Sequence, residues 1–157
     1  MSAFPAAPPR RSFLRTLLSA AAGLLALGVG RGVYAAWPAR AFAARSEMEA
    51  ERELFAEDGI VDSTAVRVDL PALAEDGAVV PLTIDTDLPA VESISVFSDK
   101  NPFPLIGRFG FGEGAAGGYV ATRIKLAETA HVTVIVRSQG RLYRARKSVT
   151  VLKGGCD

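Results

Sequence analysis

From residue 65 onward, apolar and polar residues alternate in short runs. This two-residue period is typical of half-buried β-strands and differs from the period of a helix. Glycine, proline, asparagine and aspartate, which favour turns, separate the runs. The pattern predicts about seven strands, at residues 66–70, 78–85, 91–97, 105–111, 119–126, 131–137 and 141–151.

The order of these elements indicates the fold class. No helix-length segment interrupts the strands, which argues against a parallel α/β sheet. The spacing of the runs, and the roughly 114 residues that follow residue 43, match one immunoglobulin-like domain. We therefore predict an all-β protein: an immunoglobulin-like antiparallel β-sandwich of about seven strands, with a short N-terminal helix and a flexible C-terminal arm. Pro81 predicts that its strand lies at an edge or carries a bulge.

A helical pattern precedes the strands. Ser46 followed three residues later by Glu49 forms a capping box. Four glutamates near the start of the segment suit the positive end of the helix dipole. The apolar stripe is thin, so we expect a short helix that ends near Asp58-Gly59 and docks on a larger body.

The N-terminal segment has the features of an export signal. Arg10 and Arg11 lead a cationic stretch, and residues 16–28 are mildly apolar and rich in alanine and glycine. The paired arginines followed by Ser-Phe-Leu resemble a twin-arginine signal, which directs the export of folded protein. A membrane anchor is disfavoured because the stretch is short for a bilayer and its glycines weaken it. The best small-residue cleavage site ends at Ala43, with Ala41 as the alternative.

These assignments divide the chain into four parts: a twin-arginine signal peptide (1–43), an N-terminal helix and linker (44–62), the sandwich (63–151) and a swinging arm (152–157). We expect the mature protein in the periplasm, free of the membrane once the signal is removed.

Loss of the signal changes the charge balance. The whole chain carries a formal charge of +1, but five arginines precede residue 44, which leaves 13 basic against 17 acidic residues. A mildly acidic domain of this size argues against nucleic acid or an anionic membrane as a partner. Basic residues nevertheless cluster late in the chain. We favour a solvated strand face over a docking patch for this basic cluster: Arg137, Arg141, Arg144, Arg146, Lys147 and Lys153.

Catalytic patterns are scarce. His131 is the sole histidine and stands at the head of a predicted strand, where an ordinary sheet residue is the better interpretation. Asp85 and Asp87 suit turn formation and solubility. The glycine-rich run at residues 110–114 is not followed by a helix, which argues against a phosphate-binding loop. We therefore predict neither a metal nor an organic cofactor.

Cys156 is the feature that points to chemistry. It is the sole cysteine, so it cannot pair within the chain, and an unpaired thiol in an exported protein suggests intermolecular pairing or a reactive group. Gly154 and Gly155 precede it and give the backbone wide conformational freedom with no side chain to pack. We favour a functional thiol over an incidental one on a frayed end.

A thiol on a flexible tether is suited to carrying a substrate. Four residues, 153–156, extend at most about 13 Å, enough to insert the sulfur into a partner's active-site channel. The chemistry would be exchange through the thiolate. Lys153 favours the thiolate, whereas Asp157 and the terminal carboxylate disfavour it, so a partner must supply activation. This argues for a carrier rather than an autonomous enzyme.

Three further segments, together with the terminal Gly-Gly-Cys, carry a family resemblance. Residues 76–84 (DGAVVPLTI), 97–104 (FSDKNPFP) and 122–127 (TRIKLA) resemble SoxY, the sulfur-carrier subunit of the bacterial periplasmic thiosulfate-oxidising (Sox) system. The terminal Gly154-Gly155-Cys156 resembles that family's swinging-arm motif. The resemblance spans roughly residues 46–157, and its most specific element is the C-terminal motif.

The resemblance implies partners and chemistry that spacing alone does not. Cys156 would carry intermediates as a cysteine S-thiosulfonate and related persulfides. The sandwich would pair with a second sandwich subunit, SoxZ. A c-type haem enzyme (SoxAX) would load the cysteine, and a sulfate-releasing hydrolase (SoxB) and a sulfur dehydrogenase (SoxCD) would process the cargo.

One departure from the family leaves alternatives open. The family motif usually reads Gly-Gly-Cys-Gly-Gly, whereas here Asp157 follows Cys156 and ends the given sequence. The alternatives to a carrier are a degenerate or specialised paralogue, an interaction module with an incidental tail, and a dimer linked through Cys156.

Overall fold

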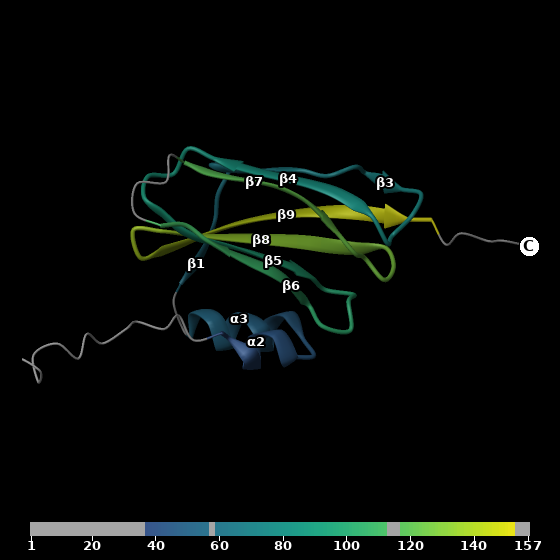
Figure 1. Ribbon diagram of the computed structural model, residues 1–157, viewed down its shortest axis with the longest axis horizontal. Helices are drawn as coiled ribbons and strands as arrows, with labels where there is room; N and C mark the ends of the chain where they lie inside the picture. The colour runs from purple at the N-terminus through teal and green to yellow at the C-terminus, as the bar shows by residue number, and fades with distance from the viewer. Residues whose placement is uncertain (1–36, 57–58, 113–116, 153–157) are drawn as a thin grey trace, which may run out of the picture. The chain divides into compact units, whose positions relative to one another are not determined.

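Two β-sheets and two short helices are formed by the residues that the computed structural model describes, namely 37–56, 59–112 and 117–152 (Figure 1). The helices are α2 (Ala39–Ala43) and α3 (Glu47–Phe55). The strands are β1 (Ile60–Asp62), β2 (Val66–Asp69), β3 (Leu73–Ala74), β4 (Val80–Thr86), β5 (Val91–Ser98), β6 (Leu105–Gly110), β7 (Gly118–Ile124), β8 (Ala130–Ser138) and β9 (Arg141–Val151). One sheet has the order β1-β9-β8-β5-β6, with β3 also paired to β9, and the other has the order β2-β4-β7.

The main core lies between the two sheets. Alternate residues of β4 are buried, as the two-residue period requires. They pack against apolar side chains from β5 and β8, and the fully buried members of this cluster are mostly branched aliphatics: Val80, Ile84, Ile94, Val132, Val134, Val136 and Val149. Branched side chains fit a pleated, buried surface well. The predicted all-β sandwich is therefore confirmed.

A second core lies on the opposite face of the larger sheet, where α2 and α3 cover it (Figure 1). Phe97 and Ile135, from β5 and β8, contact this helical layer, and the Phe55 ring of α3 meets the Phe97 ring edge to face at 6.5 Å. Strands β5 and β8 are thus buried on both faces. This explains why residues 132–136 read as a continuous run without exposed positions.

The described residues form nine strands, whereas the sequence predicted about seven. The two missed strands, β1 and β3, are three and two residues long, too short to leave a periodic signal. Both pair with β9 in parallel, so the sandwich is not wholly antiparallel. Pro81 lies in the central strand β4, yet the pairing with β2 stops at Thr83, so the proline occupies a stretch where β4 has a neighbour on one side only.

Helix α3 begins as predicted. Ser46 accepts a hydrogen bond through Oγ from the N–H of Glu49, at 3.2 Å. In a standard capping box the Glu49 carboxylate would accept a hydrogen bond from the N–H of Ser46. Here it accepts from the N–H of Arg45, one residue earlier. The helix ends at Phe55, and Ala56 follows with a φ of 53°.

The acidic residues of α3 lie near arginines of β9. Glu47 lies 3.8 Å from the guanidinium of Arg146. Burial raises the pKa of Glu51, repulsion from Glu47 raises it further, and attraction from Arg144 and Arg146 opposes the shift only in part. Ionised Glu51 is therefore a cost to the folded state at neutral pH.

Replacing this carboxylate should stabilise the protein. The pKa of Glu51 in the folded state lies above its ordinary value of 4.5. Ionised Glu51 therefore destabilises the fold fully at pH values above the folded-state pKa and not at all below the ordinary pKa, and Glu51→Gln removes this destabilisation. We expect the Tm of Glu51→Gln to rise by roughly 1–3 °C at pH 7 and to equal that of the parent below pH 4. The measurement is thermal unfolding followed by circular dichroism.

Glu53→Gln on the exposed face of the same helix is the matched control. A gain shared by both variants would indicate a general charge effect. A loss of stability in Glu51→Gln at pH 7 would contradict the assigned sign.

Candidate functional site

The predicted attachment residue lies beyond the described part of the chain. Cys156, Gly154 and Gly155 follow Leu152, the last residue that the structure describes, and the signal arginines Arg10 and Arg11 also lie outside it. What the structure defines is the place from which the arm leaves the sandwich. We call this the arm root and define it as residues 72–74, Thr129 and residues 150–152.

Strand β3 holds one edge of the arm root. It runs parallel to the end of β9, with Leu73 opposite Thr150. The N–H of Thr150 donates to the carbonyl of Ala72, and the N–H of Leu152 donates to the carbonyl of Ala74, both at 2.9 Å. Backbone bonding therefore continues to the last described residue.

The loop before β8 holds the other edge. The hydroxyl of Thr129 accepts a hydrogen bond from the N–H of Val151 at 3.0 Å. Val149 is fully buried, and Val151 packs against the main core. The root is thus fixed by hydrogen bonds on both edges and by burial on one face, so the arm departs from a defined point.

Gly77 follows β3 and packs closely against Leu126 and Val151, next to the end of β9. Its carbonyl accepts from the N–H of Leu126 at 2.8 Å. A Cβ at Gly77 would overlap the backbone carbonyl oxygen of Leu126 and lie 2.9 Å from Cγ1 of Val151. The Asp76 carboxylate accepts from the N–H of Ala78 at 2.7 Å and so holds the turn. This position requires glycine because a neighbouring backbone passes so close.

The outward face of the arm root is apolar. Leu73 is 52% exposed and Leu152 is 47% exposed. Leu73 is paired with Thr150, and Leu152 lies two residues further along the chain, so the two leucines share one face as diagonal neighbours. Exposed leucines on adjacent segments offer a contact surface next to the start of the arm.

The contacts of His131 indicate a structural role. Its N–H donates to Oδ1 of Asp99 at 2.9 Å, and its Nδ1 lies 3.2 Å from Oδ2 of the same carboxylate. Arg146 lies 3.5 Å from that Oδ2. Burial alone would raise the pKa of Asp99, but the hydrogen bonds from His131 outweigh it and the pKa is lowered. These contacts tie the end of β5 to β8 and β9, which agrees with the prediction of an ordinary sheet residue.

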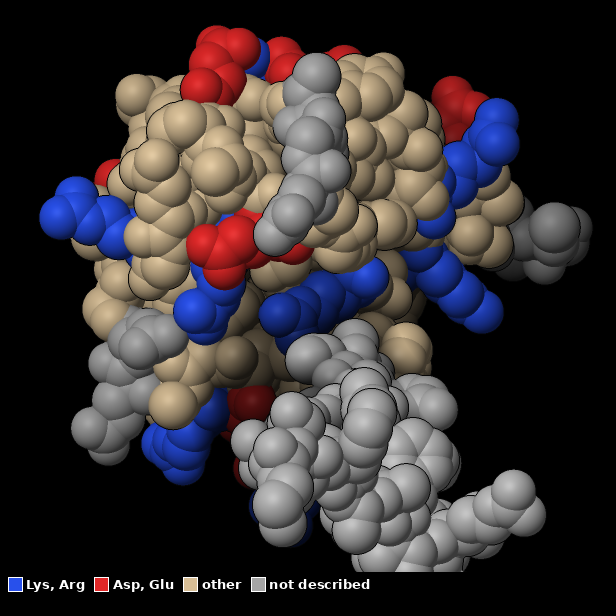
Figure 2. Space-filling model, turned by 60° about the vertical axis from the view of Figure 1, so that its left-hand side comes forward, with Lys and Arg blue, Asp and Glu red and all other residues tan. Residues whose placement is uncertain are grey.

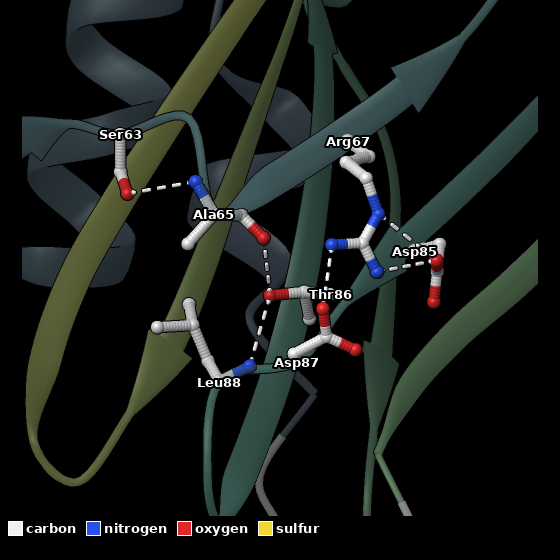
Figure 3. A network of polar contacts seen from close by, with 7 residues as sticks. All are labelled: Ser63, Ala65, Arg67, Asp85, Thr86, Asp87 and Leu88. Atoms are coloured by element: carbon white, nitrogen blue, oxygen red, sulfur yellow. Dashed lines mark hydrogen bonds and ion pairs between the residues drawn. The ribbon is translucent and has the colours of Figure 1, made fainter.

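Asp85 and Asp87 form ion pairs. The guanidinium of Arg67 on β2 reaches both, with Nη2 2.5 Å from Asp85 and Nη1 2.7 Å from Asp87 (Figure 3). Between them Thr86 donates its hydroxyl to the carbonyl of Ala65 at 2.8 Å. The exposed ion pairs and the buried hydroxyl of Thr86 join the start of β2 to the end of β4, which is a more specific role than the predicted turn formation.

The described residues of the basic cluster are dispersed over β8 and over both faces of β9. Arg144 pairs with Asp62 at 2.7 Å, and this hydrogen bond raises the pKa of Arg144 and lowers that of Asp62. On the opposite face, Nζ of Lys147 donates to the carbonyl of Val68. The guanidinium of Arg137 lies 5.6 Å from the centre of the Phe55 ring. Lys153 lies outside the described residues.

Basic and acidic side chains lie side by side on the face drawn in Figure 2 and do not form a patch of one sign. The ion pairs of Arg144 with Asp62 and of Arg146 with Glu47 and Asp99 favour the predicted strand face over a docking patch for the basic cluster.

Among the described residues no group of three or more His, Cys, Asp or Glu side chains is placed to hold a metal ion. In the same part of the chain no helix has the length and apolarity to cross a bilayer. The glycine-rich run at 110–114, predicted not to bind phosphate, falls partly outside the described residues, at 113 and 114.

The sequence pattern did not reveal the arm root. Strand β3 spans only Leu73–Ala74, and Thr129 sits in a loop, so neither leaves a periodic pattern. The one available signal was Asp76-Gly77, which reads as a turn and proves to be a close approach of two backbones.

The chain matches the family model of sulfur oxidation protein SoxY over residues 51–156. Among solved structures it is similar to the sulfur carrier protein SoxY from Chlorobium limicola f. thiosulfatophilum, with 33% identity and a TM-score of 0.61. That similarity covers 67% of this chain and 94% of the other. No curated protein matches the sequence.

A more distant likeness concerns the fold alone. The superoxide reductase (neelaredoxin) from Ignicoccus hospitalis is 19% identical, with a TM-score of 0.51 over 56% of this chain and 80% of that one. A single-residue variant of the same reductase gives the same identity and TM-score over 69% of this chain and 90% of that one. Both share the sandwich architecture.

The close approach at Gly77 predicts a sharp sensitivity. Gly77→Ala should lower the free energy of unfolding by about 1–3 kcal/mol, because the added methyl group forces the backbones of Gly77 and Leu126 apart. Gly110→Ala is the matched control, since nothing lies within 4 Å of a Cβ at Gly110. Urea unfolding measures both, and equal midpoints for the two variants would refute the assigned contact.

Proposed function

Because the chain belongs to the SoxY family of sulfur oxidation proteins, we propose that it binds sulfur intermediates covalently on Cys156 and presents them to partner enzymes. The family match extends to residue 156 and therefore includes the terminal cysteine, which is the observation that carries the proposal. SoxY is a sulfur carrier protein, so the chain is a carrier and not an enzyme.

The chemistry needs a thiolate and an electron acceptor. In loading, the sulfur of Cys156 forms a bond to the terminal sulfur of thiosulfate, the thiol loses its proton, and two electrons leave. A haem partner of the SoxAX kind would accept those electrons. Water then cleaves the sulfonate from the cargo as sulfate in a SoxB-like hydrolase, and a SoxCD-like dehydrogenase would oxidise the sulfur left on the cysteine.

The geometry of the arm root limits where partners dock. Leu152 is fixed by its hydrogen bond to Ala74. From there residues 153–156 extend at most about 13 Å. A partner whose active site receives Cys156 must therefore cover this end of the sandwich, where Leu73 and Leu152 are exposed. The apolar face of the root is the contact that such partners would share.

Members of the SoxY family work in the Sox system, and SoxY is periplasmic in general. For this chain we propose pairing with a SoxZ-like sandwich subunit and export through the twin-arginine pathway. Arg10 and Arg11 support this route because they match the paired arginines of a twin-arginine signal. That pathway exports folded protein, so a partner subunit without its own signal could cross the membrane bound to this one.

The attachment site is tested by intact mass. Purified protein incubated with thiosulfate and the loading enzymes should gain a sulfur-containing adduct, and Cys156→Ala should gain none. Reduction with a small thiol should remove the adduct, since it is held through a sulfur–sulfur bond. An unmodified parent protein under conditions in which a functional SoxY is loaded would contradict the proposal.

The alternatives to a carrier predict different results in these experiments and in a deletion variant. An interaction module with an incidental tail predicts no adduct and full sulfur oxidation after deletion of residues 154–157. A thiol-linked dimer predicts a doubled mass that disappears on reduction. Both outcomes argue against a carrier if no adduct is formed.

The negative charge next to the thiol predicts a rate effect. Two unit charges 4 Å apart in water interact by about 1 kcal/mol, so Asp157→Asn should speed attack on anionic thiosulfate by up to about fivefold. High salt should reduce the difference, because exposed charges are screened. A neutral disulfide reagent is the control, for which the two proteins should differ less. Slower loading of Asp157→Asn would show instead that a partner recognises the carboxylate.

A further inference from the structure

Helix α2 lies inside the segment that the small-residue pattern assigns to the leader. That pattern places cleavage after Ala43, or after Ala41. The helix spans Ala39–Ala43, and both Ala41 and Ala44 pack in the second core, at 1% and 2% exposure. Residues of a discarded leader have no reason to complete the core of the protein that remains.

Several contacts bind α2 to the sandwich. The helix contacts α3 and β6, and the second core joins Ala41 to Leu105 and Ile135 of the large sheet. The ring of Trp37 stacks on that of Phe42, with centroids 4.4 Å apart and planes 11° apart. Phe42 is in turn packed against the same core.

The turn after α2 is fixed as well. The guanidinium of Arg45 lies 4.1 Å from the centre of the Phe103 ring, in the loop between β5 and β6. The N–H of Arg45 donates to the carboxylate of Glu49 at 3.0 Å. The chain on both sides of the Ala43–Ala44 bond is therefore held in place.

We propose that α2 belongs to the mature protein and that the leader is cut before Trp37, at the small residues Ala35 and Ala36. The compact unit that contains the sandwich begins at Trp37. The side chain of Trp37 is 70% exposed, so a new charged amino terminus beside it meets solvent. Val33 and Ala35 stand in the spacing of a small-residue cleavage site.

If the protein folds before export, the cleavage sites before Trp37 and after Ala43 differ in how accessible they are to the peptidase. Proteases act on exposed, locally opened chain, and a folded segment is cut only as often as it opens. A leader of the twin-arginine kind accompanies folded protein, so α2 would reach the peptidase already packed. Cleavage after Ala43 would need α2 to unfold first, and it would uncover Leu105 and Ile135, whereas cleavage before Trp37 disturbs none of these contacts.

The mature N-terminus decides the proposal. The full-length precursor is expressed in a host that exports it, and the periplasmic protein is examined by intact mass and N-terminal sequencing. We expect a chain that starts at Ala36 or Trp37. A start at Phe42 or Ala44, or a chain that keeps its leader, overturns the proposal.

Three variants of the precursor give independent readouts. Replacing Ala35 and Ala36 together by glutamine should block processing. Ala43→Gln is the matched control, because Ala43 is exposed and tolerates the longer side chain, and it should be processed as the parent is. The reverse result, a block in Ala43→Gln alone, overturns the proposal.

Phe42→Ala tests retention of the helix directly. If α2 is retained, the exported protein carries the mass change and its Tm falls by roughly 4 °C or more. If cleavage after Ala43 removes α2 with the leader, the exported protein equals the parent in both mass and Tm, which overturns the proposal; cleavage after Ala41 is recognised separately by a chain that starts at residue 42.

Discussion

The pairing of β9 on both of its edges is the constraint on which the rest of the structure depends. Along one edge β9 pairs with β8 from Arg141 to Val149. Along the other it pairs first with β1 and, at its end, with β3. The last strand of the domain is therefore an interior strand. Chain ends fray unless they are tied down; here the end of the strand is tied by hydrogen bonds as far as Leu152.

This pairing fixes the position of the arm root. An arm of a few residues samples a volume whose size depends on its length, but the location of that volume depends on where the arm begins. Thr129, Ala72 and Ala74 fix the root by hydrogen bonds, so the position of Leu152, where the described chain ends, is defined at one end of the sandwich. In the proposed function, this defined root would set where the following residues reach, and partner enzymes would supply the catalytic groups.

The sequence predicted those parts of the fold that carry a repeating signal. The apolar-rich runs at residues 78–85 and 131–137 identified the buried strands β4 and β8, and Ser46 with Glu49 located the start of α3. The parts that it missed have no period. Strands β1 and β3 are too short, and α2 reads as a small-residue cleavage site because alanine suits both a helix packed close to a sheet and a peptidase site. The role assigned to Cys156 rests on chemistry rather than on a repeating pattern, and it stays a prediction because this residue lies outside the described chain.

The most direct test of the carrier account is the state of the terminal cysteine during turnover. Cells that oxidise thiosulfate are quenched with an alkylating reagent, and the C-terminal peptide of this protein is examined by mass spectrometry. The account predicts that a substantial fraction of Cys156 carries thiosulfonate or persulfide sulfur, and that this fraction falls when thiosulfate is withdrawn. A cysteine that is fully alkylated as a free thiol while thiosulfate is being consumed would contradict the account.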